Sequence, residues 1–456
     1  MPMTSITLTS PAPLWKSFLF FLLPMMASNI LQSLFGTINN IYLGQMIGVD
    51  ALAAVTVFFP VMFAFIALVM GLSTGASILI GQAFGAGDLG KVKAVAGTAL
   101  TVTLLFAGII ALFGSLFAGE LVRGLATPAN IIEAATAYAR VSMVFMPLTF
   151  AVILLTAMMR GVGDTVTPLL ALVVYTLIGL VVTPMMIAGS FGLPKLGVAS
   201  AAWASVVSSF VTLAWLYFHL RRRRHALALD TALLRAMWPD RKLLQLVLRL
   251  GIPASLSMMV MSAAELVLLG LVNGFGSDAT AAYGAVGQVM SYVQFPALSI
   301  AMTVSIFGAQ AIGRGDAGRI GAIVGTGVQM NLWLTGSLAV LGYLFSRTLM
   351  GFFITDAAVL EQAQGLLHIV LWSTVLFGMA TVFSGAMRSG GTVWAPLAIS
   401  SFAILAVEVP SAIFLSRRIG IEGIWAAYPI AFCTMFLLQM SYYLLVWRKR
   451  AVTRLI

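Results

Sequence analysis

The stretch Gly81-Gln82-Ala83-Phe84-Gly85-Ala86-Gly87-Asp88 returns later in the chain as Ala309-Gln310-Ala311-Ile312-Gly313-Arg314-Gly315-Asp316. The two copies are 228 residues apart, which is half of the chain's 456 residues. The same offset relates further pairs along the chain, namely Gly48 and Gly276, Asp50 and Asp278, Gly97 and Gly325, Arg160 and Arg388, and Pro168 and Pro396. Membrane chains built from two copies of one unit commonly place a cleft on the axis between the copies. Since corresponding segments run in the same direction, the sequence predicts a parallel repeat about an axis along the membrane normal.

The composition is typical of a membrane protein. Hydrophobic residues make up 61% of the chain and charged residues 9%, whereas about a quarter of a soluble domain is charged. The apolar runs are long enough to cross about 30 Å of hydrocarbon as helices, and they lack the alternation of a lipid-facing barrel strand. The sequence therefore predicts an all-α integral membrane protein with twelve transmembrane helices, at residues 15–37, 51–82, 93–118, 131–158, 165–189, 197–220, 246–274, 279–311, 320–346, 359–386, 393–415 and 421–447.

The basic residues predict the orientation in the membrane. If the N-terminus is cytoplasmic, 19 of the 25 Lys and Arg residues lie on the cytoplasmic side. The exceptions are Arg123, Lys195, Arg347, Arg417 and Arg418 on the outside, and Arg140 at a helix end. This asymmetry predicts a multi-pass protein of the inner membrane with both termini in the cytoplasm. It also accounts for the net charge of +11 without nucleic-acid binding, because the basic residues are spread over separate short loops.

A basic segment divides the two halves. The run Arg221–Arg224 lies in the middle of the chain and is followed by further Arg and Lys residues. We predict an N-terminal six-helix lobe at 1–220, a basic cytoplasmic linker at 221–245 and a C-terminal six-helix lobe at 246–456. Contact of this linker with anionic lipid is a secondary hypothesis.

The sequence contains no recognisable catalytic or metal-binding pattern. Its one cysteine, Cys433, excludes an intramolecular disulfide, and three histidines with one cysteine form no zinc spacing. A phosphate-binding Gly-x-x-x-x-Gly-Lys-Ser/Thr loop and a Gly-x-Ser-x-Gly elbow are both missing from the sequence. We therefore expect no enzymatic activity and no cofactor, and we expect an ion gradient or the substrate's own gradient to drive any transport.

The repeated glycine-rich stretches, together with Met159-Arg160-Gly161-Val162-Gly163-Asp164-Thr165 and Pro168, resemble the MATE (multidrug and toxic compound extrusion) family of the bacterial and archaeal type. The resemblance covers essentially the whole chain. It implies two pseudo-symmetric six-helix lobes around a V-shaped central cleft, within a wider polysaccharide-exporter and flippase superfamily. It also implies export of organic, often cationic compounds against an inward flow of protons or sodium. For the glycine-rich stretches themselves we favour a structural role, because glycine allows tight turns and close helix packing.

Two acidic residues lie deep inside predicted spans. Glu265 is about fifteen residues into the seventh span, roughly 22 Å along the helix. Glu408 lies nine residues before Arg417, roughly 13 Å from the outer surface. A charge at such depth is costly, so an intramembrane acid is a candidate for proton or cation coupling. The alternative is a neutral carboxyl that packs between helices, and for Glu408 the following Pro410 frees a backbone carbonyl that could accept its proton.

Polar side chains in the eighth span are candidates for the wall of the substrate cleft. They are Tyr283, Gln288, Tyr292 and Gln294. Hydrogen bonding between neighbouring helices is an equally good explanation for them. Asn39 in the first span is a further cleft candidate.

The chain departs from the family at several positions that the resemblance implies are functional. Asn39 replaces an acid in the first helix, and an amide cannot take up a proton near neutral pH. Gly179 and Thr183 replace an Asn and an Asp in the fifth helix. The tenth helix has only apolar residues around Leu376 where other relatives have an acid, whereas Glu265 resembles an acid of the seventh helix. Neither ion site of the family is therefore carried over intact.

The repeat also relates two pairs near the outer ends of helices. Glu133 and Arg140 are seven residues apart, and Glu361 and His368 occupy the equivalent positions. Seven residues are two helical turns, so each pair lies on one helix face. A symmetric outer gate is one hypothesis for these pairs, and a solvated rim of helix ends is the other.

Together these observations predict a secondary active exporter that exchanges an organic, amphipathic cation for protons or, less favoured, sodium. Its expected partners are the small-molecule substrate, the coupling ion and membrane lipids, and we expect a monomer. The alternatives are a flippase for lipid-linked precursors and a membrane scaffold that transports nothing.

Overall fold

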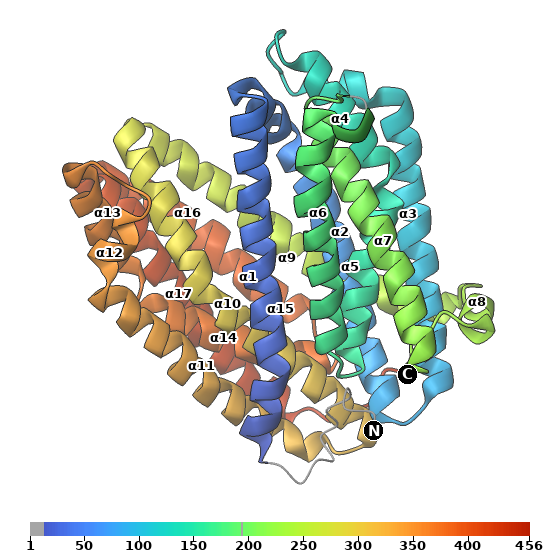
Figure 1. Ribbon diagram of the computed structural model, residues 1–456. Coiled ribbons are helices and arrows are strands. Elements are labelled where there is room, and N and C mark those ends of the chain that lie inside the picture. Colours follow the sequence, from blue (N-terminus) through green and yellow to red (C-terminus); the bar gives the residue numbers. More distant parts are fainter. Residues whose placement is uncertain (1–12, 193–194) are drawn as a thin grey trace. The chain divides into compact units, whose positions relative to one another are not determined.

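The computed structural model describes residues 13–192 and 195–456, and this part of the chain contains helices and no strands. Figure 1 shows the succession of long helices along the chain. Each of the twelve predicted spans coincides with a helical segment. The prediction of an all-α protein is confirmed.

The helices group into two compact units. Among the described residues, the first unit comprises residues 27–84 and 88–255, and the second comprises residues 13–26, 85–87 and 256–456. The limits between the units fall inside two long helices, α1 (Leu14–Met46) and α9 (Arg241–Asn273). The lobe and linker limits expected from the sequence stay a prediction.

The first unit is built on a helix core with large aromatic side chains. Beside parts of α1 and α9 it contains α2 (Val49–Gly85), α3 (Leu89–Gly124), α4 (Ile132–Val144), α5 (Met146–Gly161), α6 (Val166–Ala188), the 3₁₀ turn η1 (Ser190–Gly192), α7 (Ala199–Arg222) and the short α8 (Thr231–Ala236). Phe58 and Phe150 are fully buried in its core. α3 packs against α4, and α6 packs against α7.

The second unit surrounds one buried helix, α10 (Ser277–Arg314). The other elements are η2 (Ala317–Arg319), α11 (Ile320–Leu344), α12 (Ser346–Gly351), α13 (Ala357–Val370), α14 (Ser373–Ser389), α15 (Trp394–Phe402), the π-helical turn η3 (Ala403–Glu408), α16 (Val409–Ile419), α17 (Ile421–Leu445) and η4 (Trp447–Lys449). α10 packs against α11, α13 and α14. Buried alanines and valines line much of its length, which allows its neighbours to approach closely.

The helices have the length and composition of membrane spans. Within the described residues, nine helices are each long and apolar enough to cross a membrane, and two bent pairs bring the number to eleven. The bent pairs are α4 with α5, at 52°, and α13 with α14, at 41°. The remaining predicted span, 320–346, coincides with α11. The chain is therefore a multi-pass membrane protein.

The two bends occur at related places in the repeat but have different sequence signals. Pro147 follows the break at Phe145, as expected of a residue that cannot donate a backbone hydrogen bond. No proline marks the break between Val370 and Ser373. Prolines within other spans, among them Pro60, Pro184, Pro296 and Pro429, lie in continuous helices. A proline in this chain thus permits a bend without requiring one.

Candidate coupling site in the second unit

Glu408 lies at the end of a π-helical turn inside a membrane span. Pro410 has no N–H to give to the preceding turn, and the helix widens just before it. The N–H of Val409 consequently donates to the carbonyl of Ile404, five residues back. Such π-turns are frequent at functional sites. The turn leaves the Glu408 side chain only 6% exposed.

The structure brings the two predicted acids together. Glu265 on α9 and Glu408 lie close enough for their charges to interact. Glu265 is exposed at the surface of the unit, whereas Glu408 is covered. Among the described residues, neither acid forms an ion pair with a basic side chain. The two carboxyl groups are therefore a like-charged pair without a compensating cation.

Two tyrosines complete this cluster. The hydroxyl groups of Tyr283 on α10 and Tyr428 on α17 are 3.0 Å apart and share a hydrogen bond. Both tyrosines lie within electrostatic reach of Glu265 and Glu408. Trp425 packs against both tyrosine rings, with centroid separations of 5.2 Å and 5.5 Å. The acids thus adjoin a polar hydroxyl pair held in an aromatic wall.

Of the predicted cleft residues in this unit, only Tyr283 belongs to the cluster. Tyr292 packs edge-on against Phe295. Gln288 and Gln294 are half-buried, and within the described part of the chain neither forms a hydrogen bond with the acids. Tyr428 was not among the predicted residues. Its spacing from Trp425 and Phe432, at i, i+3 and i+7, was the available signal for an aromatic helix face.

The equivalent region of the first unit has no acid. The Thr183 hydroxyl donates to the Asn39 side-chain oxygen at 3.2 Å, so α1 and α6 meet at the positions that the family resemblance singled out. One turn away, a Cβ built on Gly179 would lie 2.5 Å from the Phe35 ring. Phe35 therefore fills the space that a side chain at position 179 would need. This region offers an amide, a hydroxyl and an aromatic ring, and no group that ionises near neutral pH.

The four outer-gate candidates have unlike surroundings. Glu133 and Arg140 are exposed on α4, and among the described residues they form no ion pair. His368 is held within its own unit, where its Nε2 lies 3.0 Å from the Ser346 hydroxyl. That hydroxyl already donates to the Tyr343 carbonyl, so His368 must be the donor. A gate role for these residues stays a prediction.

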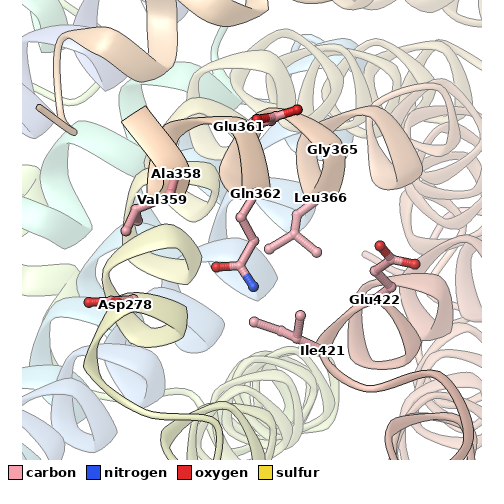
Figure 2. A pocket seen from close by; sticks show the side chains of 9 residues that line it. All are labelled: Asp278, Ala358, Val359, Glu361, Gln362, Gly365, Leu366, Ile421 and Glu422. Atoms are coloured by element: carbon pink, nitrogen blue, oxygen red, sulfur yellow. The ribbon is translucent and has the colours of Figure 1, made fainter. Parts of the chain in front are cut away.

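Glu361 lines an open pocket of about 500 Å³ at one end of the second unit. Figure 2 shows its carboxylate with those of Asp278 and Glu422 around the pocket, and Gln362 between them. Asp278 and Glu422 lie in the first turns of α10 and α17, where negative charge is favoured by the helix dipoles, whereas Glu361 lies beyond the first turn of α13. Only Asp278 and Glu422 are therefore explained in this way.

A buried carboxylate, outside the spans, fixes one end of the first unit. Asp164, between α5 and α6, is 1% exposed and accepts hydrogen bonds from the backbone N–H groups of Val166 and Thr167 and from the Thr167 hydroxyl. Its Oδ2 lies 3.5 Å from Nε2 of His225. Burial opposes ionisation, but the hydrogen bonds from His225 and Thr167 outweigh it and keep the pKa of Asp164 below its usual value. Asp164 of the family motif therefore has a structural explanation.

Replacing Asp164 with Asn is expected to destabilise the protein by about 1–2 kcal/mol at pH 7. Because the folded-state pKa lies below the unfolded value of about 3.9, the stabilisation is complete above that value and is lost as the pH falls through the folded-state pKa. The stability difference between wild type and Asp164→Asn, measured by thermal unfolding, should stay constant from pH 8 to pH 5 and shrink below about pH 4. Asp316→Asn is the control, since Asp316 is exposed and caps no helix. A difference that persists unchanged in strong acid would contradict the ionic role.

Known proteins resemble this chain along nearly its whole length. The MatE family model matches residues 24–185 and again residues 253–414, one match for each half of the repeat. The probable multidrug resistance protein YoeA of Bacillus subtilis (strain 168) is 43% identical over 449 residues, covering 98% of this chain and 97% of YoeA. The probable multidrug resistance protein NorM of Thermotoga maritima is 25% identical, covering 96% of this chain and 94% of NorM.

Solved structures share the fold. The outward-facing conformation of a multidrug resistance MATE family transporter of the MOP superfamily aligns with a TM-score of 0.86 at 23% identity, covering 95% of this chain and 97% of that chain. The twelve helical segments found here agree with that architecture. The two family matches account for most of the sequence and explain its internal repeat. The chain belongs to the MATE family, and it is a membrane transporter and not an enzyme.

Proposed function

We propose that this chain exports organic, amphipathic cations in exchange for protons, and that Glu265 and Glu408 are the proton-binding groups. The observation that carries the proposal is the pairing of these acids, within reach of each other's charge and without a basic partner among the described residues. The names of the relatives, which are multidrug resistance proteins, support the substrate class. We further propose that the protein lies in the inner membrane with both termini in the cytoplasm, which the distribution of its basic residues supports. We also propose that it acts as a monomer.

Proton binding and substrate binding are coupled because the two nearby carboxylates are unfavourable in free energy when both are charged. The covered Glu408 carboxylate lacks solvation and is repelled by the charge of Glu265, so binding of one positive charge lowers the free energy of the site. Either a proton or the cationic substrate can supply that charge. If both bind to the same carboxylates, each weakens the binding of the other by the same factor. Proton entry from outside would therefore release the substrate there, and proton loss inside would restore affinity for it.

Protons suit this site better than sodium. A hard metal cation prefers several oxygen ligands at once, whereas one carboxylate oxygen suffices for a proton. Within the described residues, no group of three or more His, Cys, Asp or Glu side chains could hold a metal ion. In the first unit, Asn39 and Thr183 supply neutral oxygens only. We therefore place the coupling in the second unit alone.

Transport by the purified protein in lipid vesicles tests this proposal. With a fluorescent organic cation as substrate, a proton gradient is expected to drive its movement against its own concentration gradient. A sodium gradient at equal pH on both sides is expected to drive none. Movement driven by sodium alone would overturn the choice of ion, and vesicles that respond to neither gradient would overturn antiport and favour a scaffold.

A further inference from the structure

A small pocket lies at one end of the first unit, where the linker after α7 folds back onto α3. Its volume is about 260 Å³, and its lining includes Lys93, Arg221, Arg224, His225 and Asp230. Figure 1 shows the linker helix α8 beside α3, against which it packs. The pocket is too small for a typical drug-sized compound, whose sites begin at about 300 Å³. It is large enough for a single small polar group.

The charges around the pocket do not cancel. Lys93 and Asp230 form an ion pair, and that interaction keeps the pKa of Asp230 below its usual value. The Nε2 of His225 faces the buried Asp164, and its Nδ1 accepts from the Leu227 N–H, so the imidazole ring is already occupied on both sides. The Arg221 guanidinium donates to the Tyr217 hydroxyl and lies 5.4 Å from the centroid of its ring. Neither Arg221 nor Arg224 has an acidic partner among the described residues. The pocket thus presents two guanidinium groups whose charge no carboxylate balances.

The structure holds this pocket in shape. Asp230 caps α8 by accepting from the Leu233 N–H at 2.9 Å. The Thr101 hydroxyl on α3 donates to the Met237 carbonyl at 2.6 Å, which ties the far end of α8 to the same helix. Arg224 adopts a positive φ of 48°, a conformation that favours glycine or asparagine. This turn ends α7, with the His225 N–H donating to the Leu220 carbonyl at 3.0 Å.

The internal repeat keeps only part of this basic set. The position equivalent to Arg221 is Lys449, whereas the positions equivalent to Lys93 and Arg224 are Gly321 and Val452. Two of the three Lys and Arg residues that line the pocket therefore occur in the first half alone.

Exposed apolar side chains lie on the same helices and linker as the pocket residues. Leu89, which lines the pocket, is 51% exposed, and Phe218 on α7, Leu234 on α8 and Trp238 just after α8 are 69%, 60% and 89% exposed. Aromatic and aliphatic side chains next to basic ones are typical of the boundary between hydrocarbon and headgroups. Juxtamembrane arginines attract anionic lipids, and the planar guanidinium group pairs well with phosphate oxygens.

We propose that this pocket binds a phosphate group through Arg221 and Arg224. An anionic phospholipid headgroup is the source that the exposed apolar surroundings favour, and a soluble phosphate is the other source of the same chemistry. Binding there would hold the linker on α3 and stabilise the first unit. The proposal does not depend on the coupling role of the acids in the second unit.

The test is thermal unfolding of the purified full-length protein in nanodiscs of phosphatidylcholine with increasing phosphatidylglycerol. The wild-type protein is expected to gain several degrees in Tm as phosphatidylglycerol is added. The double variant Arg221→Gln/Arg224→Gln should lose most of this gain, and its apparent affinity for phosphatidylglycerol should fall by about tenfold or more. A parallel titration with inorganic phosphate in phosphatidylcholine nanodiscs distinguishes the two sources.

The matched control is Arg222→Gln/Arg223→Gln, which removes the same charge from neighbouring residues that do not line the pocket. This variant is expected to keep the wild-type response to phosphatidylglycerol. An equal loss in both double variants would show general attraction to a negative surface and overturn the pocket. A Tm that responds neither to phosphatidylglycerol nor to inorganic phosphate would overturn it as well. A response to inorganic phosphate with the same variant pattern would support the site and assign it to a soluble ligand.

Discussion

Glu408→Gln is expected to reduce proton-driven efflux to the level of vesicles without protein, while the protein remains folded. Glutamine preserves the size and most hydrogen-bonding capacity of the side chain, but it cannot bind or release a proton near neutral pH. Because Glu408 is covered, at 6% exposure, little solvent is available to replace its role. The measurement is dye transport under a proton gradient, together with thermal unfolding of the same preparation.

Glu265→Gln tests whether the two acids act as a pair. If they share the coupling proton, this variant should also lose gradient-driven transport, because the remaining acid no longer experiences the repulsion that makes proton binding favourable. Substrate binding to wild type should weaken as the pH falls, and binding to either variant should be nearly independent of pH. Efflux by Glu265→Gln with an unchanged pH dependence would rule this acid out.

The matched control for both variants is Glu422→Gln. Glu422 lies in the same unit, at the exposed start of α17, and lines the pocket shown in Figure 2. Its charge is far less costly than that of a covered carboxyl, because water solvates it. Transport and its pH dependence should remain as in wild type. A comparable loss in this control would mean that net charge, and not the paired acids, sets the transport rate.

The fold could be predicted in outline because hydrocarbon imposes one strong constraint on the sequence. Every backbone polar group in the membrane must be satisfied internally, so long apolar runs must be helices. All twelve runs are helical. The break between α13 and α14 was not predicted, because no proline or glycine pair marks Leu371 and Trp372. Near Pro410, the sequence predicted a backbone carbonyl without its hydrogen bond, but it did not predict the π-helical turn. A proline does not determine how the preceding helix rearranges.

Residues of the candidate site could be predicted from the sequence only where burying their side chain in the membrane costs free energy. Glu265 and Glu408 stand out because intramembrane acids are rare and costly. Tyrosine carries no such cost, so the sequence could not separate Tyr283 and Tyr428, which meet, from Tyr292, which packs against Phe295. Asn39 and Thr183, which the family resemblance singled out separately, meet through a hydrogen bond, and a role of Asn39 in the substrate cleft stays a prediction. Phe35 was not anticipated, because its contact with Gly179 depends on how α1 and α6 pack.

Gly97→Ala is expected to destabilise the first unit, although Ala is the better helix former. A Cβ at position 97 would lie 2.3 Å from the carbonyl oxygen of Ala236 and 2.8 Å from the backbone nitrogen of Met237. These are backbone atoms at the end of α8, so no side chain can rotate away and α8 must move off α3. We expect a loss of about 1–3 kcal/mol, the usual cost of overpacking. Thermal unfolding would measure this loss, and faster proteolysis of the linker would locate it.

The repeat supplies a control for this substitution. Gly325 occupies the equivalent position in the second unit, on α11, but a Cβ there would have nothing within 4 Å. Gly325→Ala should therefore be neutral or should stabilise the protein by up to about 1 kcal/mol, because Gly is the weaker helix former. The same substitution in the same motif is thus expected to have opposite signs in the two halves.

The different surroundings of Gly97 and Gly325 indicate different reasons for a glycine in each copy of the repeat. In the first unit, Gly97 is required because α8 docks on α3, a contact that Thr101 and the Lys93–Asp230 pair reinforce. Among the described residues, no helix docks on Gly325 as α8 docks on Gly97. If Gly325→Ala proved as destabilising as Gly97→Ala, packing within the two units would not explain why these positions are glycine. The remaining explanation would then be a contact that Gly325 makes in the membrane or during transport.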